Sequence, residues 1–417
     1  MMARPMSHNH PNISGAPDTG DVLLFLTRMA GALGAHGAAA HRLEDALSAC
    51  ARRLGVHAEF FATPTGVFVT VGDIDDQRTR ITPIDSFNVN IEKLTQLDRT
   101  LTDVAEGRLD VRAGLVEIDR TMSAPSRYGP VVTTVSFGVI SACATVFFGG
   151  SVADSATAGV IGLCAGALAW LSSKDRSWTR ALEFVSGVLA AVIASLAQWI
   201  TGGAVEPATA MLAGLIVLIP GMTLTTAVNE LATRHLVSGS ARLMGALIVF
   251  VMIGFGVAVG LRIGEFIPDG AGGTSVAFAG WLVVVALLVM AYPLVVLFRA
   301  GPRQALSVLV AALVGYTGAR IGLLTLGPGL GACVGAFFVG LVSNVCARLL
   351  DRPAAVMTAP GVLLLAPGSI GFQSVSSLLE HDVITGVETA FVMALVAAAI
   401  VTGLLLANIV FPPRRAL

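Results

Sequence analysis

Beyond residue 130 the sequence is a series of long apolar segments joined by short connections. A helix needs about 20 residues, at roughly 1.5 Å each, to cross a hydrocarbon core of about 30 Å. Charged residues make up 13% of the chain, against about 25% in an average soluble domain. We therefore predict a polytopic α-helical membrane protein with about ten transmembrane helices. The candidate spans lie near residues 131–149, 155–171, 181–200, 207–222, 243–261, 276–298, 303–322, 329–347, 354–368 and 386–411.

The distribution of charge separates a soluble domain from the membrane part. Of the 53 charged side chains, 26 basic and 27 acidic, 29 precede Val131. We predict a disordered tail at 1–20, a cytoplasmic α+β domain at 21–127, and two membrane halves at 128–262 and 263–417. Within the soluble domain, the apolar periodicity predicts helices over 21–35, 38–54, 90–106 and 110–121, and strands over 56–63, 66–72 and 79–84.

Basic residues in the short connections predict the orientation of the spans, because positive charge is retained on the cytoplasmic side. With a cytoplasmic N-terminus, the inner connections hold twelve Lys or Arg residues, and the outer ones hold only Arg262 and Arg320. This bias fits ten spans with both termini in the cytoplasm. Five spans in each half, an odd number, would insert the second half upside down, which predicts two inverted five-helix repeats.

Two short runs that each stop at Pro-Gly support an internal repeat. "GLIVLIPG" covers residues 214–221, and "GVLLLAPG" covers residues 361–368. A gapless alignment of 214–249 with 361–396 has eight identities in 36 positions. The Pro-Gly pair and a second glycine eighteen residues later are its specific part.

Both runs are too short to cross a membrane. Pro207 to Pro220 encloses 12 residues and Pro353 to Pro367 encloses 13, which is about 18–20 Å of helix. Proline removes a backbone donor and glycine tolerates an unwound backbone, so we predict two broken helices that face protein or a watery cavity. The alternative is that both Pro-Gly pairs end helices at the interface, with ordinary polar loops after them.

Ionisable and amide groups in the membrane part are functional candidates, because a charge at the bilayer centre costs at least about 2.5–3.5 kcal/mol. Glu230 lies beside Asn229 at the first break and is our leading candidate for proton coupling, followed by Asp154 and Glu388. The alternative for each is snorkelling or a hydrogen bond to a neighbouring helix. Glu183 and Asn344 are further ionisable or amide residues at or inside the ends of the predicted spans.

In the soluble domain, His41 and Asp45 lie one helical turn apart with Glu44 beside them, a spacing that suits a metal or an acid–base pair. No second ligand cluster accompanies them, so we interpret them as a helix-surface ion pair and predict no metal, cofactor or catalytic site. Close helix packing is predicted at the glycine pairs Gly162/Gly166, Gly256/Gly260 and Gly331/Gly335.

Several blocks of the sequence resemble the bacterial threonine/serine exporter family. They are "HRLEDALSACARRLGV" and "EFFATPTGVFVTV" in the soluble part, and "FFGGSVADSATAG", "IPGMTLTTAVNELATRHLVSGSARL" and "APGSIGFQSVSSLL" in the membrane part. The resemblance covers nearly the whole chain from about residue 21. It implies a cytoplasmic N-terminal domain and proton-driven export (antiport) of threonine and serine across a bacterial plasma (inner) membrane. Relatives that split the two halves into separate proteins are associated with dicarboxylate export, so succinate stays an alternative substrate.

The substrate site is expected between the two breaks, because paired interrupted helices in matching positions point to the binding site of a transporter. The partners we expect are substrate, proton and lipid, without nucleic acid, and association into homo-oligomers stays open. The competing function is a membrane-tethered enzyme or regulator acting through residues 21–125, for which one or two spans would suffice. The candidate substrate-binding residues are Pro220, Gly221, Thr223, Thr226, Asn229, Asn344, Pro367, Gly368, Ser369 and Gln373.

Overall fold

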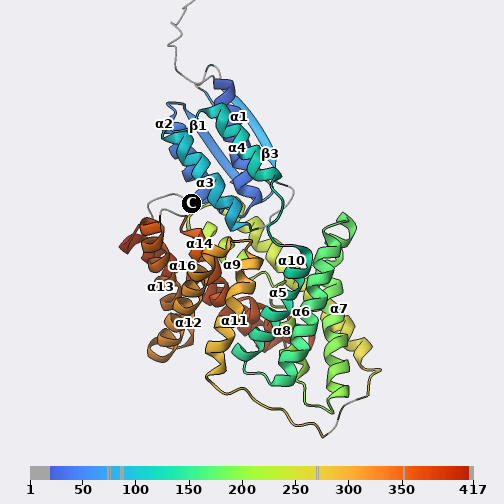
Figure 1. Cartoon of the computed structure of the whole chain (residues 1–417). Coiled ribbons are helices and arrows are strands. Elements are labelled where there is room, and N and C mark those ends of the chain that lie inside the picture. The colour runs from blue at the N-terminus through green and yellow to red at the C-terminus, as the bar shows by residue number, and fades with distance from the viewer. Residues whose placement is uncertain are drawn as a thin grey trace, which may run out of the picture.

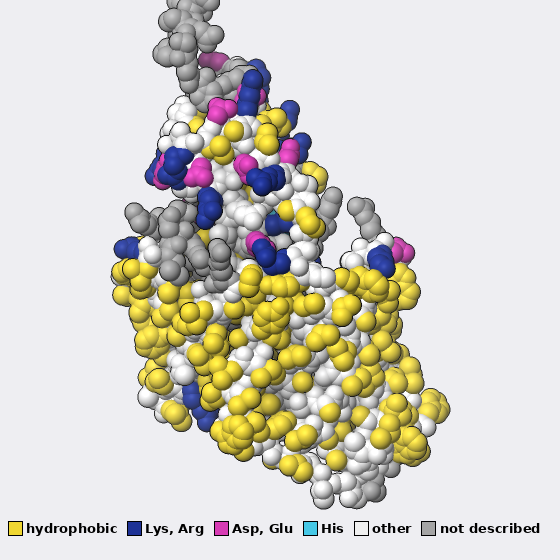
Figure 2. Space-filling view, in the orientation of Figure 1, with side chains coloured by type: hydrophobic (Ala, Val, Ile, Leu, Met, Phe, Trp, Pro, Cys, Tyr) yellow, Lys and Arg dark blue, Asp and Glu magenta, His cyan; other side chains and the backbone are white. Residues whose placement is uncertain are grey.

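The structure is a computed structural model, and it shows a small N-terminal domain on top of a helical membrane domain (Figure 1). Charged side chains cover the N-terminal domain, and hydrophobic side chains cover the membrane domain (Figure 2). The tail predicted at 1–20 lies outside the described residues, except for two residues that begin the first helix. The described residues are 19–72, 75, 77–84, 89–268, 270, 272–350 and 353–412.

The N-terminal domain is the predicted α+β unit. Its strands form an antiparallel sheet in the order β1-β2-β3. Val67, Val69 and Val71 alternate along β2 and are buried, and Phe25 and Leu26 of α1 complete this core. The elements are α1 (Thr19–Ala35), α2 (Ala40–Arg53), β1 (Ala58–Thr63), β2 (Gly66–Val71), β3 (Arg78–Pro83), α3 (Ile91–Ala105) and α4 (Val111–Ser123).

Eight segments in the described part of the chain are long and apolar enough to cross a membrane, and α11 (Leu282–Leu297) is a shorter apolar helix. The span predicted near 207–222 is not one long helix, because it is divided into α8 (Pro207–Gly214) and α9 (Gly221–Ala232). The eight segments are α5 (Pro130–Phe147), α6 (Val152–Ser172), α7 (Arg176–Ile200), α10 (Leu236–Gly264), α12 (Ala305–Leu326), α13 (Pro328–Leu350), α14 (Ala355–Leu365) together with α15 (Gly368–Leu379), and α16 (Val383–Val410).

Both Pro-Gly pairs interrupt a helix and begin another one. Pro220 and Pro367 hold the N-cap positions of α9 and α15, with φ of −80° and −78°. The alternative that polar loops follow them is wrong, since α9 and α15 are regular helices of 12 residues each. Hydroxyl side chains in these helices can form hydrogen bonds within the helix itself. Thr225, for example, donates a 3.0 Å hydrogen bond to the Gly221 carbonyl.

The two halves of the membrane domain match in local structure beyond the breaks. Arg234 and His381, which are 147 positions apart, end α9 and α15 with the same positive φ of 66°. Shortly afterwards, Gly239 lies against Leu231 and Gly386 lies against Leu378 in the same way. The neighbours also correspond, because α7 packs on α10 as α13 packs on α16, and α9 and α15 each contact both α10 and α16.

Glycine allows the long helices to approach closely, as the sequence predicted. A Cβ atom added to Gly256 would lie 2.2 Å from the Phe184 carbonyl oxygen, and one added to Gly260 would lie 2.5 Å from the Val188 carbonyl oxygen. Helix α10 therefore touches the backbone of α7. The other two predicted pairs, Gly162/Gly166 and Gly331/Gly335, make similarly close contacts with α5 and α12.

We expect Gly256→Ala to destabilise the protein and Gly245→Ala, on the same helix, to leave it at least as stable. The new methyl at 256 would overlap a backbone carbonyl, an overpacking that costs about 1–3 kcal/mol, whereas nothing lies within 4 Å of the Gly245 position. Thermal unfolding of the purified protein in detergent measures both. Equal melting temperatures for the two variants would contradict the α7–α10 packing.

Candidate functional site

The two Pro-Gly breaks lie against one another inside the membrane domain. A Cβ atom added to Gly221 would lie 3.2 Å from the Gly368 nitrogen, and one added to Gly368 would lie 2.6 Å from the Ile219 side chain. Residues 147 positions apart thus form one contact, at which the N-terminal ends of α9 and α15 meet. The first N–H groups of a helix lack partners within it and carry partial positive charge.

A cavity of about 510 Å³ borders this contact. Gly221, Gly368 and Ser369 line it from the two breaks. Tyr316 and Arg320 line it from α12, and the remaining wall is mostly apolar and comes from α5, α11, the end of α14 and the residues just before each break. The cavity can hold an anionic group between the helix starts and the Arg320 guanidinium, with two hydroxyls as further hydrogen-bond partners.

Two further cavities border the first break. One of about 680 Å³ has Pro220, Thr223 and Glu183 in its wall. The other, of about 140 Å³, lies between the N-terminal domain and the membrane domain and is lined by Thr226 and Asn229. The predicted substrate-binding residues of α9 therefore border different spaces, with Thr223 at the cavity of about 680 Å³ and Thr226 and Asn229 at the cavity of about 140 Å³.

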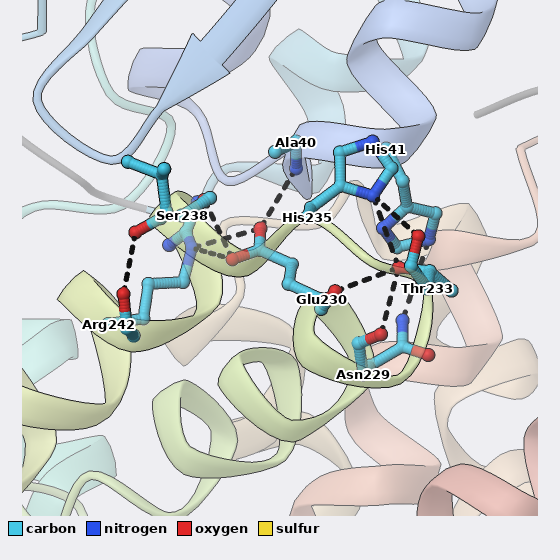
Figure 3. Close-up of polar contacts among 10 residues, drawn as sticks. Ala40, His41, Asn229, Glu230, Thr233, His235, Ser238 and Arg242 are labelled. Carbon is cyan, nitrogen blue, oxygen red and sulfur yellow. Dashed lines mark hydrogen bonds and ion pairs between the residues drawn. The ribbon is translucent and has the colours of Figure 1, made fainter.

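Glu230 is fully buried where the N-terminal domain meets the membrane domain (Figure 3). Its Oε1 accepts a 2.9 Å hydrogen bond from the backbone N–H of Ala40, the first residue of α2. Its Oε2 accepts a 2.7 Å hydrogen bond from the Ser238 hydroxyl and lies 3.0 Å from Arg242 Nε. Because the N-cap side chain of α2 makes no hydrogen bond, this carboxylate caps α2 from the other domain.

Two histidines lie beside Glu230 at the same interface. His235 Nε2 is 3.1 Å from Glu44 Oε2. His41 Nε2 is 3.5 Å from Asn229 Nδ2, so this ring nitrogen accepts when it carries no proton. Burial, followed by the charge of Arg42, lowers the pKa of His41 to about 3, and the ring is therefore neutral near pH 7.

The helix-surface ion pair predicted around His41 is wrong. Asp45 is exposed, and His41 faces the membrane domain instead. Glu44 accepts a 2.7 Å hydrogen bond from the Ala62 backbone and pairs with His235 through its other oxygen. Helical spacing alone cannot reveal that this face of α2 covers another domain. In the part of the chain that the structure describes, no group of three or more His, Cys, Asp or Glu residues could hold a metal ion.

Except for Pro367, the remaining candidates lie away from the meeting point of the breaks. Asp154 forms a capping box with Ser151 at the start of α6, and its Oδ1 accepts a 2.6 Å hydrogen bond from the Glu206 backbone at the start of α8. Asn344 donates two 2.8 Å hydrogen bonds to the C-terminal end of α16 and the residue after it. Pro367 is buried at the second break. The candidates with exposed side chains are Gln373 and Glu388.

Sequence reasoning missed partners that meet only in the folded chain. The sequence suggested that Arg242 and Arg320 lie in the connections between spans. Both lie inside apolar helices instead. Arg242 pairs with Glu230, and Arg320 lines the cavity beside the breaks. Their position within an apolar run was a usable signal, because a charge at membrane depth needs a partner or a watery surface.

Comparisons with known proteins agree with this architecture. Two family models for threonine/serine exporters match residues 24–264 and residues 278–410. Similar curated proteins are fungal and are named pheromone-regulated membrane protein 10. The relative from Debaryomyces hansenii is 27% identical over 88% of this chain and 37% of its own length, and that from Candida glabrata is 23% identical over 88% and 48%.

This chain thus spans less than half the length of these curated relatives. No solved structure matches it. The two family matches begin in the N-terminal domain, include both Pro-Gly breaks and end in α16. The chain is a multi-pass membrane protein and belongs to the threonine/serine exporter family.

Proposed function

We propose that this protein is a secondary active exporter of threonine and serine, coupled to protons. The observation that carries the proposal is the contact of the two Pro-Gly breaks beside a cavity of about 510 Å³. There the helix starts of α9 and α15 offer N–H groups and partial positive charge to a substrate carboxylate. Backbone carbonyls freed at the breaks attract the ammonium group of the substrate, and Ser369 can bind the substrate hydroxyl. Membership of an exporter family supports transport over a tethered enzyme.

We further infer that the two halves are inverted repeats of five helices. Helix α10 begins beside the N-terminal domain, whereas α16 ends on that side of the membrane domain (Figure 1). The shared geometry of the breaks and of Arg234 and His381 supports a common origin of the halves. In transporters built this way, one repeat rocks against the other around a central site. The contact of Gly221 with Gly368 lies where such a movement would act.

We place both termini in the cytoplasm and the protein in a bacterial plasma membrane. The excess of basic residues on the inner side, eleven against one when Arg242 and Arg320 are left out, supports the orientation. The bacterial location follows from the family resemblance, and the fungal relatives named above show that similar proteins also occur in fungi.

A reporter that works only outside the cytoplasm should be active after Gly202 and silent after Lys174 or at the C-terminus. These positions follow α7, precede α7 and follow α16, respectively. Activity of the fusions measures the topology. A C-terminus on the outer side would mean an odd number of spans and would remove the inverted repeat.

Serine and threonine should compete for export better than alanine or valine. A site that binds a hydroxyl leaves polar groups unpaired with a ligand that lacks one, at about 1–3 kcal/mol per group, or roughly 5- to 150-fold. Competition against labelled threonine in everted vesicles, with and without a pH gradient, measures this. Ser369→Ala should reduce the preference for serine and threonine over alanine and valine. Ser240→Ala, at an exposed position, should leave this preference unchanged.

Two outcomes of this assay oppose the assignment. Alanine that competes as well as serine would refute a hydroxyl site. Succinate as the better substrate would favour dicarboxylate export, for which the cavity already offers two helix starts and Arg320. The transporter architecture would stand in both cases.

For proton coupling we propose Glu230 first, with Asp154 and Glu388 as alternatives. Protonation of Glu230 would weaken its pairing with Arg242 and its hold on the Ala40 N–H, and would so connect proton binding to the position of α2. Asp154 already caps two helices, and Glu388 is exposed.

Glu230→Gln should abolish the dependence of export on the pH gradient, because the side chain keeps its size but no longer titrates. Glu230→Gln also removes the carboxylate beside the buried Arg242, and breaking a buried ion pair costs about 3–5 kcal/mol. The double variant with Arg242→Gln therefore serves as the matched, neutral pair. Proton-gradient-dependent export by the folded double variant would exclude Glu230. Asp154→Asn and Glu388→Gln in the same assay then identify the coupling carboxylate.

A further inference from the structure

The cavity of about 140 Å³ between the two domains has an unusual wall. Arg42 of α2 lines it from the N-terminal domain, and Thr226 and Asn229 of α9 line it from the membrane domain. Thr358 of α14 adds a hydroxyl-bearing residue from the second half. A small space thus brings together the soluble domain, the first broken helix and the second one.

Among the residues described at this cavity, none is an acid that could pair with Arg42. Within the described residues it makes no hydrogen bond and no ion pair, although its side chain is half-buried. Burial lowers the pKa of its guanidinium. Partial burial of a guanidinium costs free energy, which an anion or several hydrogen-bond acceptors beside it offset.

The carboxylates nearby are already used by other partners. Glu44 pairs with His235 and accepts from the backbone of β1. Glu230 pairs with Arg242 and caps α2. Asp45 is exposed. The described residues that line this cavity therefore supply positive charge, hydroxyl groups and an amide, but no anion for Arg42.

The size of the cavity limits what that anion can be. A water-sized group needs roughly 10–15 Å³ of such space, so about ten of them fit in the volume of about 140 Å³. This space suits a small amino acid or a small organic acid better than a nucleotide or a peptide. Lining groups that bind hydroxyls favour a hydroxy amino acid among these.

We propose that Arg42 binds the carboxylate of the transported amino acid, at an entry site that the N-terminal domain completes. Thr226 and Asn229 contact the hydroxyl and ammonium groups of the same molecule from α9. The inference rests on the proposed export function and deepens it, because it makes the N-terminal domain part of the transport path. Undocking of α2 would then open or close this site.

The test compares ligands with and without a carboxylate on full-length variants. Calorimetric titration of the purified protein with L-threonine and with L-threoninamide should show that Arg42→Gln weakens threonine binding at least about tenfold and leaves threoninamide binding unchanged. Arg52→Gln, an exposed arginine on the same helix, is the control and should bind both ligands like the unaltered protein. Equal effects of Arg42→Gln on both ligands, or none, would overturn the proposal.

Two further measurements keep the result decisive. If Arg42→Gln does not fold, Thr226→Tyr fills the cavity from the opposite wall, and threonine binding that survives it refutes the site. If the unaltered protein neither transports nor binds threonine, the proposal of threonine export fails. Titration with succinate then shows independently whether the cavity binds a carboxylate. Succinate binding that depends on Arg42 would support a carboxylate site, and its absence would refute one.

Discussion

A backbone that unwinds inside a membrane must find partners for its N–H and carbonyl groups, and the rest of this structure depends on how that constraint is met. The protein places one broken helix against the other, with Gly221 and Gly368 in direct contact. Only glycine permits this approach, because a Cβ atom on Gly368 would lie 2.6 Å from Ile219. Two positively polarised helix starts meet as a result, beside a cavity large enough for a small anion.

A second interaction sets the position of the N-terminal domain. The buried carboxylate of Glu230 caps α2 and pairs with Arg242, so it joins the soluble domain to the end of the first broken helix. The same docking brings Arg42 over α9 and α14, which encloses the small cavity between the domains. Helix α9 therefore connects the contact of the two breaks, at its first residue, with the docked N-terminal domain, at Glu230.

Much of the fold could be predicted from the sequence, because it depends on local chemistry. Apolar length and Pro-Gly located eight segments of membrane length and both interruptions, and alternation of Val67, Val69 and Val71 located the central strand. Sequence spacing did not predict that the polar residues after each break continue as helices. Nor could it show which cavity each residue of α9 faces, since that depends on the helix's rotation against its neighbours.

The sequence by itself determined that most of the chain lies in a lipid bilayer, that a soluble part precedes the membrane part, and that the helix breaks are paired. These features follow from composition, proline and glycine. Only the tertiary structure decided the partners of the charged groups. Glu230 and Arg242 are twelve positions apart, and Ala40 and Glu230 are 190 apart, yet they form one buried cluster. Such pairs carry no local pattern, because a buried charge is satisfied by whatever the packing of distant helices brings within hydrogen-bonding distance.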